Sequence, residues 1–326
     1  MKITNFLRRC GSGKNIKLFY LINNGVRWLM PNTFYRRRLA PTLAQLPNRA
    51  DQDYIQGRVD YCNKLQTITP LPEDAPTLAE LCYAVAGTVY YFDAFEYVRW
   101  FDPALRWKHR TGDVIEVPPT PAIVKSRPIV GDNANSVLLN QDKVRHFTFL
   151  NDTIPFSQKQ PKAIFRGLIY QENRKRFARQ YFGNPLFDIG AVGRIFEGCE
   201  QEWLTKKMSL WEHLRYQFIF ALEGNDVASN LKWVMSSNSV AVMPKPRYET
   251  WFMEGRLVPN FHYIEVRPDF SDVEERLRYY IERPQEAEAI ARNANKFVAQ
   301  FFDAERERLI SLLVLQKYFR MTGQLS

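Results

Sequence analysis

The sequence has few cysteines and histidines, and none of them are spaced like metal ligands. The four cysteines form no C-x-x-C pair, and the four histidines are scattered along the chain. This spacing argues against a zinc site and a disulfide scaffold, and it is typical of a reducing compartment. The residues are Cys10, Cys62, Cys82, Cys199, His109, His146, His213 and His262. We therefore expect no metal site built from these residues, and a cytoplasmic location.

The sequence also lacks an apolar run long enough to cross a membrane. The most apolar stretch near the amino terminus, residues 16–29, is interrupted by Lys17, Asn24 and Arg27 among others. A spanning helix needs about 20 consecutive apolar residues. No small-residue cleavage site follows an uninterrupted apolar region, so the pattern does not predict a signal peptide.

Acidic residues are absent from residues 1–50, which contain ten lysines and arginines. The whole chain has 45 basic and 35 acidic residues, so the remainder of the chain is balanced in charge. Cations beside an apolar stretch are attracted to an anionic membrane surface, each contributing about 1 kcal/mol. We predict a peripheral contact of residues 1–50 with the inner face of a membrane. A solvated basic surface helix is the equal alternative.

The length of 326 residues, 45% of them hydrophobic, is sufficient for two domains with buried cores. The first half has proline-rich connectors, whereas the second half alternates strand-like and helical patterns. We place the domains at residues 1–155 and 156–326, the second ending in carboxy-terminal helices. Alternating strands and helices indicate an α/β fold with a parallel sheet covered on both faces.

The expected elements of the second half locate the candidate ligand loops. Strands are expected at residues 162–165, 186–189, 216–222, 239–243 and 262–266. Helices are expected at residues 171–181, 203–214, 227–236 and 285–302, and in the first half at 78–100. Ligands of parallel sheets bind in the loops beyond the carboxyl ends of strands. The loops 166–171, 223–226 and 244–251 are therefore the first candidates.

Arg166 and Gly167 end a predicted strand and begin a loop before a basic helix that contains Arg174. A glycine lets the backbone approach a ligand closely, and an arginine can hold a diphosphate through two parallel hydrogen bonds. The amino end of the following helix adds a partial positive charge that favours an anion. A turn glycine followed by a solvated helix face explains the pattern equally well.

Residues 216–239 combine a buried strand, a loop with Glu223 and Gly224, and a helix with Ser229 and Lys232. A carboxylate at a strand end can accept hydrogen bonds from both ribose hydroxyls, and Ser229 or Lys232 can reach phosphate oxygens. No G-x-G-x-x-G or G-K-[ST] loop is present, which disfavours dinucleotide oxidoreductases and phosphate-loop ATPases. An ordinary acidic loop that caps a helix remains the alternative.

Four blocks across residues 162–302 resemble glycosyltransferase family 90 in their order and spacing, and within it the bacterial lipopolysaccharide-modifying branch. They are Phe165-Arg166-Gly167, residues 216–239, Glu249-Thr250-Trp251-Phe252 and His262-Tyr263-Ile264-Glu265-Val266. The resemblance implies a GT-B-like α/β fold, in which two Rossmann-type domains face each other across a cleft and residues 156–326 bind a UDP-sugar. It also implies transfer, with inversion, to a hydroxyl of lipopolysaccharide or another lipid-linked surface glycan.

The resemblance further implies roles for individual residues. Asp113 would deprotonate the acceptor hydroxyl, with Asp132 as the second candidate base. The acceptor side would be lined by Lys125, Arg127 and Asp132. The donor would be held by Arg166, Gly167, Arg174, Glu223, Gly224, Ser229, Lys232 and Glu249. The sequence has no convincing D-x-D pattern, and we expect neither a cofactor nor an obligatory metal.

The loop at residues 223–226 departs from the eukaryotic members of that family. Glu223-Gly224-Asn225-Asp226 and Asn230 stand where those members commonly carry an Arg-Gly and another arginine. The donor sugar is therefore not carried over from the resemblance.

Two interpretations from other classes stay open at this point. The sequence pI of about 9.4 fits a basic nucleic-acid-binding protein, and the fold also fits a non-catalytic scaffold. The excess charge is confined to residues 1–50, and the chain has no RNP-type aromatic motif or zinc-finger spacing. We therefore expect no nucleic-acid partner.

Overall fold

The computed structural model describes Gly13, residues 17–82 and residues 86–325. The chain forms two compact units, each assembled from separate stretches. The sheet unit contains Arg145–Pro246 and Gly255–Gln300. The helical unit contains Lys17–Val144, Arg247–Glu254 and Phe301–Ser326.

These units differ from the expected division after residue 155. The chain passes from the helical unit to the sheet unit between Val144 and Arg145. Two later stretches, Arg247–Glu254 and Phe301–Ser326, belong to the helical unit again. Composition along the chain does not reveal such returns, because they depend on contacts between residues far apart in sequence.

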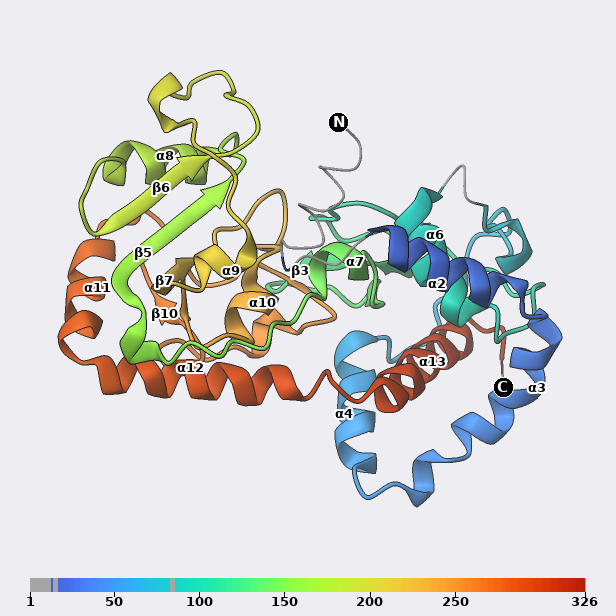
Figure 1. Cartoon of the computed structure of the whole chain (residues 1–326). Helices are drawn as coiled ribbons and strands as arrows, with labels where there is room; N and C mark the ends of the chain where they lie inside the picture. The colour runs from blue at the N-terminus through green and yellow to red at the C-terminus, as the bar shows by residue number, and fades with distance from the viewer. Residues whose placement is uncertain (1–12, 14–16, 83–85, 326) are drawn as a thin grey trace. The chain divides into compact units, whose positions relative to one another are not determined.

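The sheet unit is built on five parallel strands in the order β10-β8-β7-β5-β6 (Figure 1). The strands are β5 (Gln160–Gly167), β6 (Phe187–Ala191), β7 (Tyr216–Phe220), β8 (Val240–Met243) and β10 (Ile264–Glu265). Every residue of β7 and β8 is buried, as their continuous apolar runs require in the middle of a parallel sheet. The predicted α/β class with a parallel sheet is confirmed.

Helices follow the strands of this sheet and pack on it. The helix α8 (Glu172–Tyr181) follows β5 and contacts β6, and α10 (Leu231–Met235) follows β7 and contacts β8. After β10 come α11 (Val273–Glu282) and α12 (Pro284–Ala299), the long helix drawn in orange-red below the strands of the sheet in Figure 1. Pro284 suits the first turn of α12, where its missing N–H is not needed. In the core, the rings of Phe177 and Phe220 meet edge to face with centroids 4.5 Å apart.

Three expected helices are wrong in extent. The helix expected at 227–236 is limited to α10, at Leu231–Met235. In place of a helix at 203–214 the structure has the 3-10 turn η4 (Gln201–Trp203) and the short helix α9 (Leu210–His213). Ser209 and Glu212 form a capping box that starts α9, with the Glu212 N–H donating to Ser209 Oγ at 3.2 Å. Of the helix expected at 78–100, residues 83–85 lie outside the described residues; the described part contains η2 (Leu78–Glu80) and α6 (Thr88–Val98), with Gly87 at φ 74° before α6.

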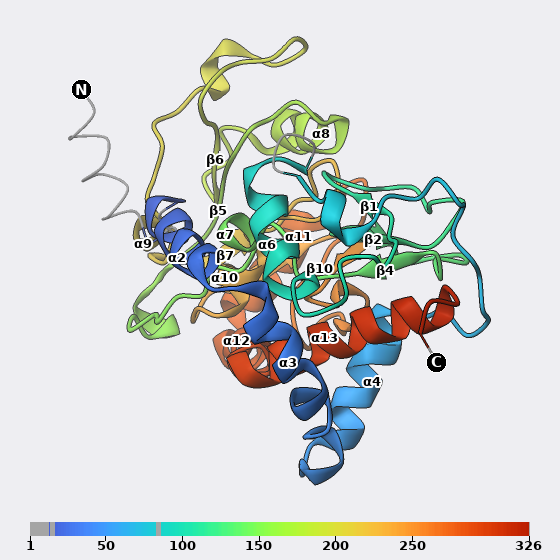
Figure 2. The ribbon, with the colours of Figure 1, turned by 90° about the vertical axis from the view of Figure 1, so that its right-hand side faces the viewer.

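The helical unit is organised around α13 (Ala304–Met321). This helix packs against α3 (Asn32–Leu43), α4 (Gln52–Cys62) and α6, and Figure 2 shows α3 and α4 beside it. Its residues from Leu309 to Leu315 are all buried. The Asp303 side chain caps the helix by accepting hydrogen bonds from the N–H groups of Glu305 and Arg306.

Short strands and turns complete the helical unit. The strands β1 (His109–Arg110), β2 (Ala122–Val124) and β4 (Ser136–Leu138) form a three-stranded parallel sheet. The strands β3 (Ser126–Pro128) and β9 (Tyr248–Thr250) form an antiparallel ribbon in which Arg127 lies opposite Glu249. The helical unit also contains α2 (Lys17–Leu29) and η1 (Leu46–Asn48), whereas η3 (Phe156–Gln158) belongs to the sheet unit. The elements α7 (Lys143–His146) and η5 (Glu254–Arg256) lie where the chain passes from one unit to the other. In the described part of the chain, no helix is both long and apolar enough to cross a bilayer.

A buried ion pair attaches β9 to the helical unit. Arg127 and Glu249 are almost completely buried, and Arg127 Nε donates to Glu249 Oε1 at 2.8 Å. The other guanidinium nitrogens donate to the carbonyls of Ser136 at 3.0 Å and Tyr61 at 2.6 Å, and the Tyr61 hydroxyl also donates to Glu249. The carboxylate therefore has partners on both oxygens.

A second buried pair attaches α13 to α4. Arg58 Nη1 lies 2.9 Å from Glu307 Oε1, and the indole N–H of Trp251 donates to Glu307 Oε2 at 2.5 Å. Because Trp251 follows β9, the two pairs together hold the stretch Arg247–Glu254 to α4 and α13 of the same unit.

We predict that Arg127→Met lowers the free energy of unfolding by about 3–5 kcal/mol, because Glu249 is left as a buried charge without its cation. Unfolding in urea, followed by circular dichroism, measures this loss. Arg278→Met is the control, since Arg278 pairs with Glu274 at the surface of α11 and should change stability little. Equal stability of the two variants would contradict the role of the buried pair.

Candidate active site

The sheet topology itself indicates where a ligand binds. Counted in chain order, the five strands have the spatial order 2-1-3-4-5, so the order reverses between β5 and β7. Ligands of such open α/β sheets bind beyond the carboxyl ends of the strands at this switch point. The relevant loops follow β5, at residues 168–171, and β7, at residues 221–230. The loop after β7 contains the predicted donor-binding residues Glu223, Gly224 and Ser229, and the loop after β5 is flanked by two others, Gly167 and Arg174.

Arg174, in the first turn of α8, joins these two loops. Its guanidinium donates to the carbonyls of Leu168 at 2.9 Å, Leu222 at 2.8 Å and Glu223 at 3.1 Å. Gly224 allows the close approach, because a Cβ atom on it would lie 3.3 Å from Arg174 Nη2. The structure thus brings together the predicted residues Arg174, Glu223 and Gly224.

A second contact between the loops comes from polar side chains. The Tyr170 hydroxyl donates to Asn225 Oδ1 at 2.9 Å, and the Gln171 amide donates to the same oxygen at 3.4 Å. Tyr170 and Asn225 are not among the predicted site residues, although both lie in the candidate loops. Their long-range pairing gives no signal in the sequence.

The Arg174 guanidinium is largely shielded from solvent. Burial lowers the pKa of Arg174 to about 10; the neighbouring Tyr170 opposes this shift, and the positive charge of Arg145 adds to it. The acceptors of its hydrogen bonds are neutral carbonyls, and no carboxylate within the described part of the chain forms an ion pair with it. A partly desolvated cation without an anionic partner is well suited to bind an anion such as a phosphate.

Two polar atoms near this edge of the sheet have unused hydrogen-bonding capacity. Arg166 Nε and Gln171 Oε1 are buried and have no hydrogen-bond partner among the described residues. Buried polar atoms are normally hydrogen-bonded, so such exceptions are expected where a ligand or an ordered water completes the site. The helix α8 begins here as well, and the Gln171 side chain makes no capping hydrogen bond to its first turn. The partial positive charge at the amino end of the helix favours an anion.

Arg166 and Gly167 lie at the end of β5 and have different neighbours. The Arg166 guanidinium forms an ion pair with Asp188 of β6 and donates to the Asp188 carbonyl at 2.7 Å. Burial opposes ionisation of Asp188, but hydrogen bonds from Tyr216 and Arg166 outweigh it and lower the pKa of Asp188. Gly167 lies in the strand, where a Cβ atom would be 3.0 Å from the Phe165 ring. Arg166 is thus engaged by a carboxylate, whereas Arg174 has no carboxylate partner among the residues that the structure describes.

Asp188 and Tyr216 are functional candidates that the sequence reasoning missed. Asp188 lies in an expected strand, and a charged residue inside a buried parallel strand is a signal that could have identified it. Tyr216, at the start of β7, donates to Asp188 Oδ2 at 2.5 Å. Together they fix the orientation of Arg166.

Ser229 and Lys232 lie beyond β7 as expected. Ser229 is half-buried in the loop before α10, and Lys232 is completely buried within that helix. Asn230 donates to the Phe220 carbonyl at 2.9 Å and so holds the loop against the end of β7. The proposed contacts of Ser229 and Lys232 with the donor remain predictions.

Glu249, the last predicted donor-binding residue, belongs to the helical unit. There it is the partner of Arg127 in the buried pair described above, and its exposed fraction is only 1%. The structure therefore brings Glu249 together with Arg127, a predicted acceptor-side residue, and does not place it in the unit that contains Arg174. Its predicted contact with the nucleotide remains a prediction.

The predicted base Asp113 and the predicted acceptor-side Lys125 lie side by side in the helical unit. Lys125 Nζ is 2.5 Å from Asp113 Oδ1; the lysine is buried, whereas the aspartate side chain keeps 21% exposure. The Ser126 hydroxyl donates to the Val114 carbonyl at 3.1 Å and fixes the loop that carries Asp113. Asp132 instead accepts a hydrogen bond from the Ala134 N–H in an exposed turn. Among the described residues, no cluster of three or more acidic, histidine or cysteine side chains could hold a metal ion.

A family model described as Glycosyl transferase family 90 matches residues 140–322, more than half of the chain. The chain belongs to glycosyltransferase family 90. The family match includes the predicted donor-binding residues from Arg166 to Glu249, whereas Asp113 and the acceptor-side residues precede it.

Two relatives in this family extend the comparison. The chain is 38% identical over 308 residues to O-glucosyltransferase LpsA of Dichelobacter nodosus, which covers 94% of this chain and 96% of that protein. It is 27% identical over 164 residues to Protein O-glucosyltransferase 3 of Homo sapiens, covering 49% of this chain and 32% of the human protein. The predicted family is confirmed, and the chain is a glycosyltransferase. The enzyme assignment replaces the two alternatives from other classes.

We predict that Arg174→Met weakens the binding of UDP about 10- to 100-fold, because a charge-assisted contact with phosphate contributes about 1.5–3 kcal/mol. Isothermal titration calorimetry with UDP measures the change. Arg176→Met is the matched control, since Arg176 lies exposed on the same helix. The site assignment fails if both variants bind UDP as the wild type does.

Proposed function

We propose that this family 90 enzyme transfers a sugar from a UDP-sugar to a hydroxyl of a lipid-linked surface glycan such as lipopolysaccharide. The observation that carries the proposal is the desolvated Arg174 at the switch point of the sheet unit, where it can neutralise a diphosphate. The name of the bacterial relative, O-glucosyltransferase LpsA, supports glucose as the first donor sugar to test. It also supports a lipopolysaccharide acceptor, through its Lps designation.

The proposed reaction is a single displacement with inversion at the anomeric carbon. The acceptor oxygen attacks that carbon while its proton passes to the Asp113 carboxylate. The bond from the anomeric carbon to the β-phosphate oxygen breaks, and its electron pair stays on UDP. Arg174 and the amino end of α8 would stabilise the charge that develops on this leaving group. Lys125 would orient the Asp113 carboxylate toward the acceptor.

We propose a GT-B-like organisation for the chain, in which different units bind the donor and supply the catalytic base. The sheet unit would bind the nucleotide, and the helical unit would supply the base. The proposal is supported by parallel sheets in both units, although the strands β1, β2 and β4 are only two or three residues long. We propose further that the enzyme works on the cytoplasmic face of a membrane. The free thiols of Cys62, Cys82 and Cys199 are compatible with that compartment.

We predict that Asp113→Asn lowers kcat for sugar transfer about 10²- to 10⁴-fold, because the acceptor hydroxyl loses its base. A screen of UDP-sugars for hydrolysis first identifies the donor without knowledge of the acceptor, and the transfer assay then uses that donor. UDP binding by Asp113→Asn should equal that of the wild type. Asp132→Asn is the matched control and should retain activity; loss of activity in Asp132→Asn alone would move the base to Asp132.

We predict that the reaction requires no metal ion, because Arg174 and a helix amino end can neutralise the leaving diphosphate. Activity should be the same after treatment with EDTA and after addition of Mg²⁺ or Mn²⁺. Loss of activity in EDTA, with recovery on adding Mn²⁺, would contradict this part of the mechanism.

A further inference from the structure

The helix α2 turns its polar side toward the protein. The Tyr20 hydroxyl donates to Asp93 Oδ1 at 2.7 Å and contacts the Val89 carbonyl at 3.2 Å. One turn later Asn24 is buried, with an exposed fraction of 6%, and Arg27 pairs with Glu96 of α6 at 2.8 Å. A surface helix normally buries its apolar side, so this orientation is the reverse of the usual one.

The opposite side of α2 exposes large apolar side chains. At about 100° per residue, the apolar positions fall within about a third of the circumference, centred opposite Asn24. They are Leu18, exposed by 49%, Phe19 by 54%, Ile22 by 50%, Val26 by 61% and Leu29 by 75%. Trp28 and Met30 add further exposed apolar surface at the carboxyl end of the helix. A continuous exposed apolar face of this kind marks a site of contact with a membrane or with another protein.

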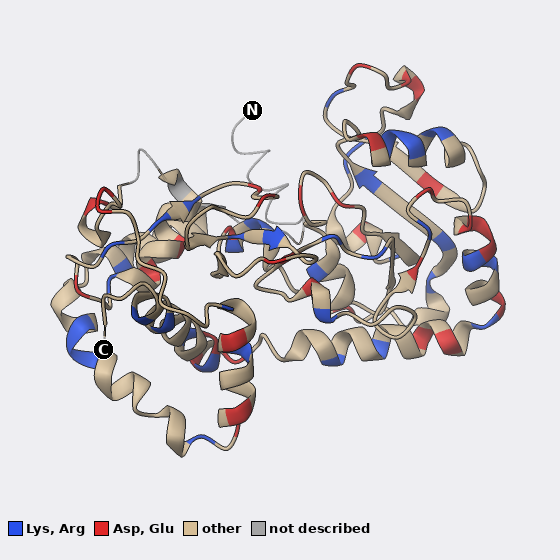
Figure 3. Ribbon diagram, turned by 180° about the vertical axis from the view of Figure 1, so that it is seen from behind, with Lys and Arg blue, Asp and Glu red and all other residues tan. Residues whose placement is uncertain are grey.

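The surroundings of this face are positively charged. Residues 1–50 contain no acidic residue. Figure 3 shows α3 with basic but no acidic residues, whereas α11 and α12 carry both signs. A bilayer with anionic lipids matches both the charge and the apolar face. A second copy of the chain would bring two positive surfaces together, and this disfavours self-association through α2.

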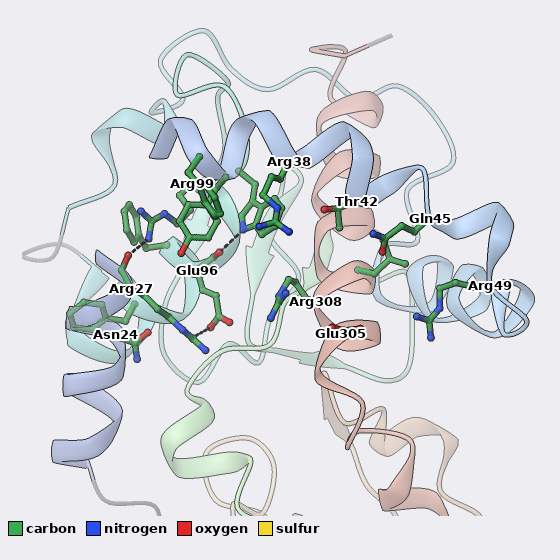
Figure 4. Close-up of a pocket in the computed structure, with 16 residues that line it drawn as sticks. Asn24, Arg27, Arg38, Thr42, Gln45, Arg49, Glu96, Arg99, Glu305 and Arg308 are labelled. Atoms are coloured by element: carbon green, nitrogen blue, oxygen red, sulfur yellow. Dashed lines mark hydrogen bonds and ion pairs between the residues drawn. The ribbon is translucent and has the colours of Figure 1, made fainter. Parts of the chain in front are cut away.

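A basic pocket opens beside α2, between α2, α3, α6 and α13 (Figure 4). Its volume is about 350 Å³, which is enough for a phosphate with part of a headgroup. The charged side chains that line it are Arg27, Arg38, Arg49, Arg99, Arg308, Glu96 and Glu305. Five cations against two carboxylates leave an excess of positive charge, so the pocket favours an anion.

Some of these arginines hold the pocket together, whereas others are available to a ligand. Arg99 donates to the carbonyl of Arg27 at 2.6 Å, and its guanidinium lies 4.0 Å from the centre of the Tyr35 ring. Arg38 lies over the Phe34 ring at 5.1 Å, and Arg38 and Arg308 form no ion pair within the described part of the chain. These two exposed guanidinium groups are therefore the candidates for contact with phosphate.

We propose that α2 lies in the interface of an anionic phospholipid bilayer, with its Leu18–Leu29 face inserted and a lipid phosphate bound by Arg38 and Arg308 in the basic pocket. Interfacial helices of this type bury an apolar face at the boundary between headgroups and acyl chains. The inference concerns a surface outside the proposed donor site and does not depend on the sugar-transfer reaction.

Sedimentation of the full-length protein with lipid vesicles tests the proposal. Vesicles of phosphatidylglycerol mixed with phosphatidylcholine should bind the wild type, and vesicles of phosphatidylcholine alone should bind it at least about tenfold more weakly. The double variant Ile22→Glu/Val26→Glu should lose binding to the anionic vesicles at least about tenfold, because two charges enter the apolar face. The matched control Val130→Glu/Val258→Glu, at exposed apolar positions outside α2, should bind as the wild type does.

The pocket has its own variant, Arg38→Gln/Arg308→Gln. It should lose about tenfold or more in affinity for anionic vesicles while its weak binding to phosphatidylcholine stays unchanged. Unchanged binding to anionic vesicles would overturn the role assigned to the pocket.

Two other outcomes would overturn the membrane proposal as a whole. The first is equal sedimentation of the Ile22→Glu/Val26→Glu variant and its control. The second is a wild-type dimer that becomes monomeric in the Ile22→Glu/Val26→Glu variant without any vesicle binding, which would assign the face to a second copy. Unchanged UDP binding and thermal unfolding of each variant show that its fold is intact.

Discussion

The helical unit depends on the buried ion pair between Arg127 and Glu249. The pair joins β3 to β9. In the sequence, β9 comes after residues 145–246, which belong to the sheet unit. A buried ion pair adds little net stability compared with apolar packing, but the loss of one partner is costly. The pair therefore acts mainly by specifying how β3 and β9 align. Any other alignment of the two strands would separate Arg127 from Glu249 and leave both charges buried and unpaired. The neighbouring pair of Arg58 and Glu307 imposes the same condition on α13.

Much of the sheet unit could be predicted from local patterns. The strands β5, β7 and β8 and the helices α8 and α12 lie close to their expected ranges, because buried parallel strands and amphipathic helices have clear periodicities. The helices at residues 203–214, 227–236 and 78–100 were predicted longer than the described helices α9, α10 and α6. The start of α9 depends on a capping box at Ser209, and α6 follows a glycine with positive φ, Gly87; an apolar pattern records neither of these local features. The return of residues 247–254 to the helical unit depends on partners more than 100 residues away in sequence.

The sequence predicted which loops contain the candidate site, but it predicted the partners of individual side chains less well. The sequence places Arg174, Glu223 and Gly224 beyond the carboxyl ends of strands, and the structure brings them together. Arg166 was expected to hold the diphosphate, but in the structure Asp188 engages this side chain, and within the described chain Arg174 forms no ion pair with a carboxylate. Which arginine is paired depends on side-chain directions across neighbouring strands. Those directions follow from the strand order, which the sequence alone did not supply.

The central claim is that the loops after β5 and β7 form a UDP-binding site in a family 90 glycosyltransferase. Hydrogen–deuterium exchange of the full-length protein, with and without UDP, tests it most directly. We predict that UDP slows exchange at residues 168–174 and 222–230, since a bound diphosphate would order both loops that Arg174 connects. Slower exchange only in the helical unit, or no change on adding saturating UDP, would contradict the assignment.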